Sequence, residues 1–192
     1  MRQTPRQTPL RTLVLAATCA LLLALVAAPA ATAVEPYLFT LSGMAGVGGS
    51  QDAEPGSGFG NFGYQLGFSF ITETRTRVAV RLGEMELGDG GDFARLTDAG
   101  LSYLSVAGEY RFPEHYYDTW FSFGLGAYRL DGDPRVAGAD DEETAIGLSI
   151  GLTGEFRLMR KMDLVVEASG HYVDFEDAQV YGNVLAGVAF HF

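Results

Sequence analysis

The stretch VVEASGHYVDF, residues 165–175, contains the side chains best suited to catalysis. It places Glu167, Ser169 and His171 at every second position, and serine, histidine and a carboxylate are the components of a hydrolase site. In an extended chain, however, residues two positions apart are separated by ~6–7 Å, farther than a catalytic hydrogen bond reaches. The same alternation predicts that these side chains point into an enclosed interior. The sequence therefore favours a non-enzymatic role.

A second group of reactive side chains lies in the acidic segment DGDPRVAGADDEE, residues 131–143. Its carboxylates offer the oxygen ligands that divalent cations prefer, but they lack the glycine and glutamate spacing of an EF-hand loop. His115 and His191 are isolated from each other and have no metal-ligand spacing. We therefore expect a solvated acidic loop, with neither a metal nor a cofactor.

The net charge excludes one large class of partner. The chain carries a formal charge of -11, and Lys161 is its only lysine. Binding to nucleic acid requires clusters of lysine and arginine that neutralise phosphates, so we expect no nucleic-acid partner.

The N-terminus has the three parts of a secretory signal peptide. Arg2, Arg6 and Arg11 precede the apolar run TLVLAATCALLLALVAAPA, and Ala-Thr-Ala then offers a cleavage site after Ala33. The alternative is a transmembrane anchor, for which the apolar run is short. We predict a cleaved signal peptide over residues 1–33 and one domain over residues 34–192. The only cysteine lies within the signal peptide, so the predicted domain forms no disulfide.

Alternating hydrophobicity organises the rest of the chain. In NFGYQLGFSF, residues 61–70, large apolar side chains alternate with glycine, serine and short polar residues, and AIGLSIGLTGEFRL repeats the pattern. The third such segment is the weakest, because Glu84 and Glu86 continue the face of Val80 and Leu82. A bulge at Gly83, or emergence of the strand from the apolar zone, could explain this. The eight predicted strands cover approximately residues 36–48, 61–72, 76–87, 101–112, 119–130, 144–157, 163–174 and 179–192.

The size of the polar side chains indicates which face points inward. The outer face of a soluble barrel is rich in long polar residues, whereas here the polar face is mostly glycine, serine and alanine. Small residues suit the narrow interior of eight strands, with the apolar face toward lipid. Short and long connections also alternate, except for the short segment EDA, residues 176–178. The predicted fold is all-β, an eight-stranded antiparallel up-and-down transmembrane β-barrel.

Charged residues of both signs lie on the predicted inner face. Enclosed charges need partners, because an unpaired charge costs several kcal/mol. We therefore predict a charge network that fills the lumen, the alternative being scattered charges exposed to solvent. The members of this predicted network are Arg77, Arg81, Glu109, Arg111, Glu155, Arg157, Glu167 and His171.

The chain ends on an aromatic residue in mid-pattern. In NVLAGVAFHF, apolar residues occupy alternate positions, and Leu185 is a large apolar residue on the other face. A closed barrel has no sheet edges, so this last strand must pair with the first. Aromatic residues near other segment ends match interfacial girdles, although Phe68 lies inside its segment. The alternating residues of the ending are Val184, Ala186, Val188, Phe190 and Phe192.

These features together resemble the small outer-membrane β-barrel family, which includes the OmpA-type transmembrane domain and the OmpX-like and opacity-type barrels. The resemblance implies signal-peptide-directed export to the outer membrane of a Gram-negative-type bacterium. It implies lipid and lipopolysaccharide as neighbours. It also implies that the barrel-assembly machinery recognises the ending from Val184 to Phe192. The ligand of the outer loops stays open.

Three functions are consistent with this resemblance. The first is a non-enzymatic structural or surface-interaction role, with acidic extracellular loops and a charge-filled lumen. The second is a narrow channel for ions or small solutes, as in OmpW-like proteins. The third is a lipid A-modifying enzyme. Glu167, Ser169 and His171 superficially resemble the histidine, serine and glutamate set of lipid A deacylases in residue type.

Overall fold

The computed structural model describes residues 37–50, 59–88, 96–113, 117–134, 142–175 and 180–192. The predicted signal peptide and most of the acidic segment lie outside these residues. Within them, no helix is both long and apolar enough to cross a membrane.

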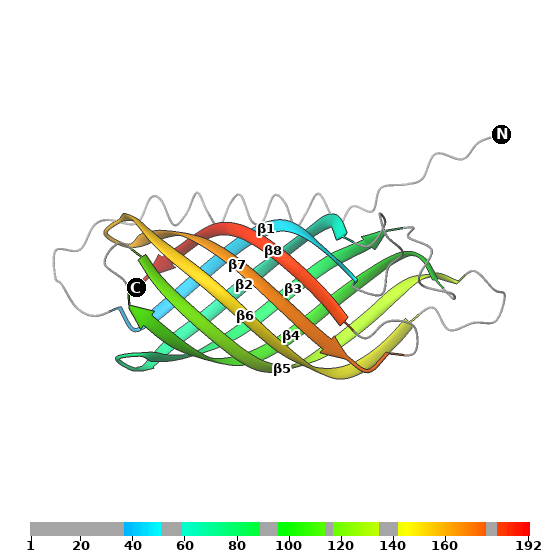
Figure 1. Cartoon of the computed structure of the whole chain (residues 1–192), viewed down its shortest axis with the longest axis horizontal. Helices are drawn as coiled ribbons and strands as arrows, with labels where there is room; N and C mark the ends of the chain where they lie inside the picture. Colours follow the sequence, from blue (N-terminus) through cyan, green and yellow to red (C-terminus); the bar gives the residue numbers. More distant parts are fainter. Residues whose placement is uncertain (1–36, 51–58, 89–95, 114–116, 135–141, 176–179) are drawn as a thin grey trace. The chain divides into compact units, whose positions relative to one another are not determined.

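Eight strands form a closed antiparallel barrel in which each strand pairs with its neighbours in sequence (Figure 1). β8 pairs with β1 from Thr40↔His191 to Ser50↔Tyr181, which closes the sheet. The prediction of an eight-stranded up-and-down barrel is therefore confirmed. The strands are β1 Phe39–Ser50, β2 Phe59–Glu73, β3 Thr76–Gly88, β4 Leu96–Pro113, β5 Tyr117–Pro134, β6 Glu142–Met159, β7 Met162–Val173 and β8 Val180–His191.

The two ends of the barrel differ. The turn end carries the two-residue turns β2–β3 and β6–β7, together with the start of β1 and the end of β8, and lies at the left in Figure 1. At the opposite end, the loop end, β4 and β5 continue to the pair Leu96↔Pro134, whereas β6 and β7 pair only from Gly147↔Val173. One wall of the barrel is therefore taller at the loop end.

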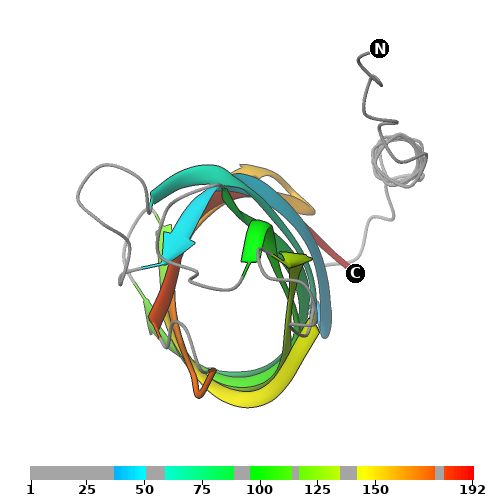
Figure 2. The ribbon, with the colours of Figure 1, turned by 90° about the vertical axis from the view of Figure 1, so that its right-hand side faces the viewer.

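The burial of successive residues follows the alternation in the sequence. On β5, the outward residues Phe121, Phe123 and Leu125 are exposed, whereas Ser122 and Gly124 between them are buried. Beyond Ala127 the outward face becomes polar, so β5 presents about the 9–11 residues that a membrane strand requires. Viewed along its axis, the barrel is oval (Figure 2). The apolar face points outward, as a barrel in lipid requires.

The interior near the loop end is apolar, which the sequence analysis did not predict. Leu101 and Leu130 are fully buried there and pack with Tyr128 and Tyr181. We call this cluster the apolar plug. Most of its residues lie on β3, β4 and β5, and β7 and β8 contribute one residue each. Its members are Met85, Leu87, Leu96, Ala99, Leu101, Tyr103, Tyr128, Leu130, Val173, Phe175 and Tyr181.

The structure has no bulge at Gly83, which was one of the two explanations for the weak pattern of the third segment. Gly83 pairs in unbroken register with Gln65 on β2 and Tyr103 on β4, and the β3–β4 register shifts only between Glu86 and Gly88. A side chain at Gly83 would collide with the ring of Tyr103, which explains the glycine without any bulge.

Two glycines allow the closing strands to approach closely. A Cβ atom at Gly187 of β8 would overlap the carbonyl oxygen of Gly43 and lie 2.7 Å from the Cα of Met44. A Cβ atom at Gly46 of β1 would likewise overlap the carbonyl oxygen of Val184. Barrel closure at this seam therefore depends on the absence of side chains at both positions.

Candidate functional site

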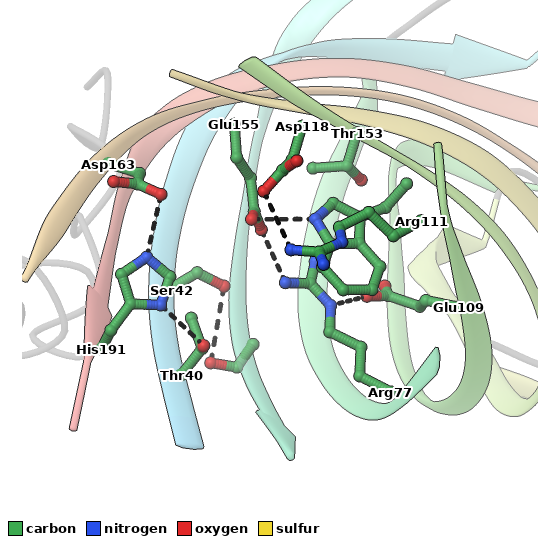
Figure 3. A network of polar contacts seen from close by, with 12 residues as sticks. Thr40, Ser42, Arg77, Glu109, Arg111, Asp118, Thr153, Glu155, Asp163 and His191 are labelled. Carbon is green, nitrogen blue, oxygen red and sulfur yellow. Dashed lines mark hydrogen bonds and ion pairs between the residues drawn. The ribbon is translucent and has the colours of Figure 1, made fainter. Parts of the chain in front are cut away.

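The polar centre of the lumen is built from two arginines of β3 and three glutamates of β4, β6 and β7. Arg77 donates hydrogen bonds to Glu109 and, over 2.7 Å, to Glu155 (Figure 3). Arg81 donates to Glu109 as well and, over 3.2 Å, to Glu167. All five side chains are buried, so Glu109 is the carboxylate that joins the two cations. We call these five residues the lumen ion network.

Neutral side chains complete this network. Trp120 donates from Nε1 to Glu155 over 2.9 Å, and its ring lies 3.9 Å below the guanidinium of Arg77. Thr153 donates to Glu167 over 3.1 Å, and Gln65 donates to the other oxygen of Glu167 over 3.2 Å. These donors compensate a network in which three glutamates face only two arginines. Sequence analysis missed them, although their inward phase was readable.

The other three predicted members lie outside the lumen ion network. Arg111 pairs with Asp118 over 3.3 Å and reaches the network only through the ring of Trp120, 5.7 Å away. Arg157 pairs with Asp163 over 2.8 Å, and its side chain is 58% exposed. Both arginines lie near the turn end, where each forms an ion pair with an aspartate instead of with the central glutamates. The structure thus joins five of the eight predicted residues in the lumen ion network and places Arg111, Arg157 and His171 outside it.

His171 belongs to a separate cluster, on the loop-end side of the lumen ion network. Its Nδ1 lies 3.0 Å from the hydroxyl of Tyr128, and its ring lies 5.0 Å from the ring of Tyr103. Tyr103 in turn donates to Gln65 over 2.7 Å. His171 therefore links the lumen ion network to the apolar plug instead of balancing a charge.

The prediction that Ser169 and His171 lie too far apart for a hydrogen bond is wrong. Ser169 Oγ lies 3.1 Å from His171 Nε2, because the two side chains lean toward each other from the same strand face. Asn183 hydrogen-bonds to both residues: its Oδ1 accepts from Ser169 Oγ over 2.8 Å, and its Nδ2 lies 3.3 Å from His171 Nε2. The partner of His171 Nδ1 is the hydroxyl of Tyr128 and not Glu167. His171 is 3% exposed, and Ser169 beside it is partly buried on the same lumen-facing side of β7.

A third polar cluster fastens β8 between its neighbours at the turn end (Figure 3). His191 lies 3.0 Å from Asp163 of β7 through Nε2 and 3.0 Å from Thr40 of β1 through Nδ1. All three side chains are buried. The ring of Tyr37 stacks on His191 at 5.8 Å. We call Thr40, Asp163 and His191 the closure clamp, because they connect three strands across the closing seam.

Replacing His191 by phenylalanine tests the closure clamp. The change keeps a ring against Tyr37 but removes both hydrogen bonds and leaves Asp163 with Arg157 alone. We expect the free energy of unfolding to fall by about 1–3 kcal/mol, the cost of a buried polar group left without its partner. Urea titration in lipid vesicles measures this, and an unchanged midpoint would contradict the role of the clamp. Thr72→Val, which removes an exposed hydroxyl in the β2–β3 hairpin, is the control.

The C-terminal strand presents alternate residues outward. Val184, Ala186 and Phe192 are exposed and Val188 and Phe190 are partly exposed, whereas the alternate residues Leu185, Ala189 and His191 are buried. Phe39, at the start of β1, stacks on Phe192 at 5.9 Å and on Phe68 at 5.8 Å. Phe68 therefore belongs to the aromatic surface of the turn end. Recognition of Val184, Ala186, Val188, Phe190 and Phe192 by assembly machinery stays a prediction.

One small cavity lies beside the lumen ion network. A cavity of about 20 Å³ lies among Ser42, Gln65, Arg81 and Glu167, large enough for one or two water molecules. Among the residues that the structure describes, no group of three histidine, cysteine or acidic side chains is arranged to hold a metal ion. The described lumen can therefore bind water and hold charge.

A closed barrel with an apolar exterior and a polar lumen defines the class of integral membrane β-barrels. Within this class, residues 18–192 match the profile of the family described as outer membrane protein beta-barrel domain. The chain belongs to this family, which supports a location in the outer membrane.

Two solved structures share the fold. The structure of Neisserial surface protein A matches with a TM-score of 0.60 at 17% identity, over 81% of this chain and 97% of that one. A major outer membrane protein from Thermus thermophilus also matches with a TM-score of 0.60, at 13% identity, over 82% of this chain and 100% of the other. A comparison with curated proteins found no match.

Proposed function

We propose that this protein is a closed, non-enzymatic outer-membrane barrel with a structural or surface-interaction role. The observation that carries the proposal is the filling of the lumen at two levels. The lumen ion network occupies the polar part, and the apolar plug, with Leu101 and Leu130 fully buried, occupies the part near the loop end. Eight strands leave an interior just wide enough for such side chains.

The outward face of the loop end supports a surface role. Glu84, Glu86, Asp131 and Glu142 continue the outward face of β3, β5 and β6 beyond the apolar residues. Arg129 pairs with Glu142 over 2.8 Å, and the rest of this face is predominantly acidic. We infer that the loop end faces the cell exterior, beside lipopolysaccharide, and that the turn end faces the periplasm.

The position of the most hydrolase-like pair of residues supports the non-enzymatic part. The closest arrangement to a hydrolase site among the described residues is Ser169 with His171, and both lie inside the barrel, away from lipid. A lipid A-modifying enzyme needs its reactive group open to the bilayer. Mass spectrometry of lipid A from cells that make the protein tests this, and an altered acyl pattern that disappears in Ser169→Ala would overturn it.

A narrow channel is the alternative, and the small cavity beside Arg81 and Glu167 is the observation in its favour. The filled lumen predicts that wild-type protein in a planar bilayer gives no steady single-channel current. Removal of the plug by Leu101→Ala with Leu130→Ala should not create current while the lumen ion network is intact. Discrete wild-type conductance steps that Glu109→Gln alters would replace the closed-barrel proposal with the channel.

A further inference from the structure

The β6–β7 turn combines two cations with a rigid backbone. β6 ends at Met159 and β7 begins at Met162, so Arg160 and Lys161 form the turn itself. The carbonyl oxygen of Arg160 accepts a hydrogen bond from the hydroxyl of Tyr37 over 3.0 Å. The carbonyl oxygen of Lys161 accepts one from the backbone N–H of His191 over 2.9 Å. The turn is therefore held at both residues, while the side chain of Arg160 is exposed and that of Lys161 is partly exposed.

Neither cation is neutralised within the described residues. Asp163, the acidic residue nearest in sequence, is taken by Arg157 over 2.8 Å and by His191 over 3.0 Å. Arg160 and Lys161 form no ion pair with any other residue that the structure describes. This is a local excess of positive charge in a chain whose net charge is -11.

Apolar side chains lead directly to this turn. Leu158 is 52% exposed and Met159 is 65% exposed, immediately before Arg160. They continue the lipid-facing side of β6 without an intervening acidic residue. The β2–β3 turn is different, because an acidic residue, Glu73, ends β2 two positions before Arg75. The exposed apolar residues of β6 are Ile146, Leu148, Ile150, Leu152, Phe156, Leu158 and Met159.

The end of an apolar column that runs directly into cations matches the boundary between acyl chains and headgroups at one face of a membrane. The acyl chains lie against the column, and the headgroup phosphates lie level with the cations. We propose that Arg160 and Lys161 bind the phosphate headgroups of anionic phospholipids in the leaflet at the turn end. Each cation near an anionic surface contributes about a five-fold preference, and the two together contribute roughly 30-fold at low salt.

Spin-labelled lipids test the site directly. The full barrel is reconstituted in phosphatidylcholine with a trace of labelled phosphatidylglycerol or labelled phosphatidylcholine, and the motionally restricted fraction gives their relative association. Wild type should favour phosphatidylglycerol, and Arg160→Gln with Lys161→Gln should lose most of this preference. Arg129→Gln, which removes an exposed cation at the loop end, should retain it. The exchange Arg160→Lys with Lys161→Arg should retain it as well.

Three outcomes would overturn the proposal. One is equal association of both lipids with wild type, and another is an unchanged preference in the double glutamine variant. The third is specific retention on isolated peptidoglycan without lipid preference, which would assign the cations to a different partner. Heat-modified gel mobility of each variant shows that the barrel is folded, so a lost preference reports the headgroup site alone.

Discussion

Glu109→Ala should reduce the free energy of unfolding by about 3–5 kcal/mol, the cost of removing one partner from a buried ion pair. Among the described residues, Glu109 is the carboxylate that pairs with both Arg77 and Arg81, so its loss leaves two buried guanidinium groups with one carboxylate each. Urea titration of the protein in lipid vesicles, followed by the fluorescence of Trp120, measures the change.

The matched control removes a glutamate from an exposed pair. Glu142 pairs with Arg129 over 2.8 Å, and both side chains are about half exposed, so Glu142→Ala should change stability by less than about 1 kcal/mol. Similar losses in Glu109→Ala and Glu142→Ala would contradict a special role for the lumen ion network. Glu109→Gln separates charge from shape, and should fall between wild type and the alanine variant.

Gly187→Ala should prevent normal closure of the barrel. The added methyl group would overlap the backbone of β1 at Gly43, and backbone cannot move aside as the end of a flexible side chain can. Overpacking typically costs about 1–3 kcal/mol and occasionally more, and an overlap with backbone belongs at the upper end of this range. In a refolding assay we expect a large loss of the compact, heat-modifiable band on cold gels, and Gly46→Ala should behave in the same way.

Gly43→Ala is the control on the same seam. Its Cβ atom would lie 3.7 Å from the side chain of Leu66, an ordinary van der Waals contact, and nothing nearer obstructs it. This variant should fold like wild type. Efficient refolding of Gly187→Ala, or equal failure of Gly43→Ala, would show that close approach at the seam is not what these glycines provide.

The strand pattern could be read from the sequence because burial in a barrel repeats every two residues. Phe121, Phe123 and Leu125 alternate with small or polar residues, and the structure exposes the first set and buries the second. Which face meets lipid was readable from side-chain size, since a narrow interior admits mainly small groups. The ends of the strands differ from the predictions by a few residues because polar extensions at the loop end have no such constraint.

The partners of the inward residues could not be read in this way. Alternation predicts that Arg111 and Arg157 point inward, but it does not predict that Asp118 and Asp163 pair with them in place of the central glutamates. The separation of Ser169 and His171 was misjudged for a related reason. Strand geometry fixes the backbone spacing, whereas rotamers bring the side-chain atoms to 3.1 Å.

The apolar plug was missed because its members come from four or more strands. β4 contributes four of these residues and each of the other strands one or two, so no single stretch of the sequence indicates a core. Leu101 and Tyr103 on β4 and Tyr128 and Leu130 on β5 were the available evidence, since they are large residues on an otherwise small inner face. They become a cluster only when register places them at one level.

The tryptophan of the chain tests the filled lumen most directly. Trp120 is the only tryptophan, points inward against Arg77 and Glu155, and is 3% exposed. Its fluorescence in the folded, vesicle-inserted protein should resist quenching by acrylamide and iodide, and become fully quenchable after unfolding in urea. Quenching in the folded barrel as efficient as in the unfolded chain would mean a water-filled lumen, and would contradict the closed barrel.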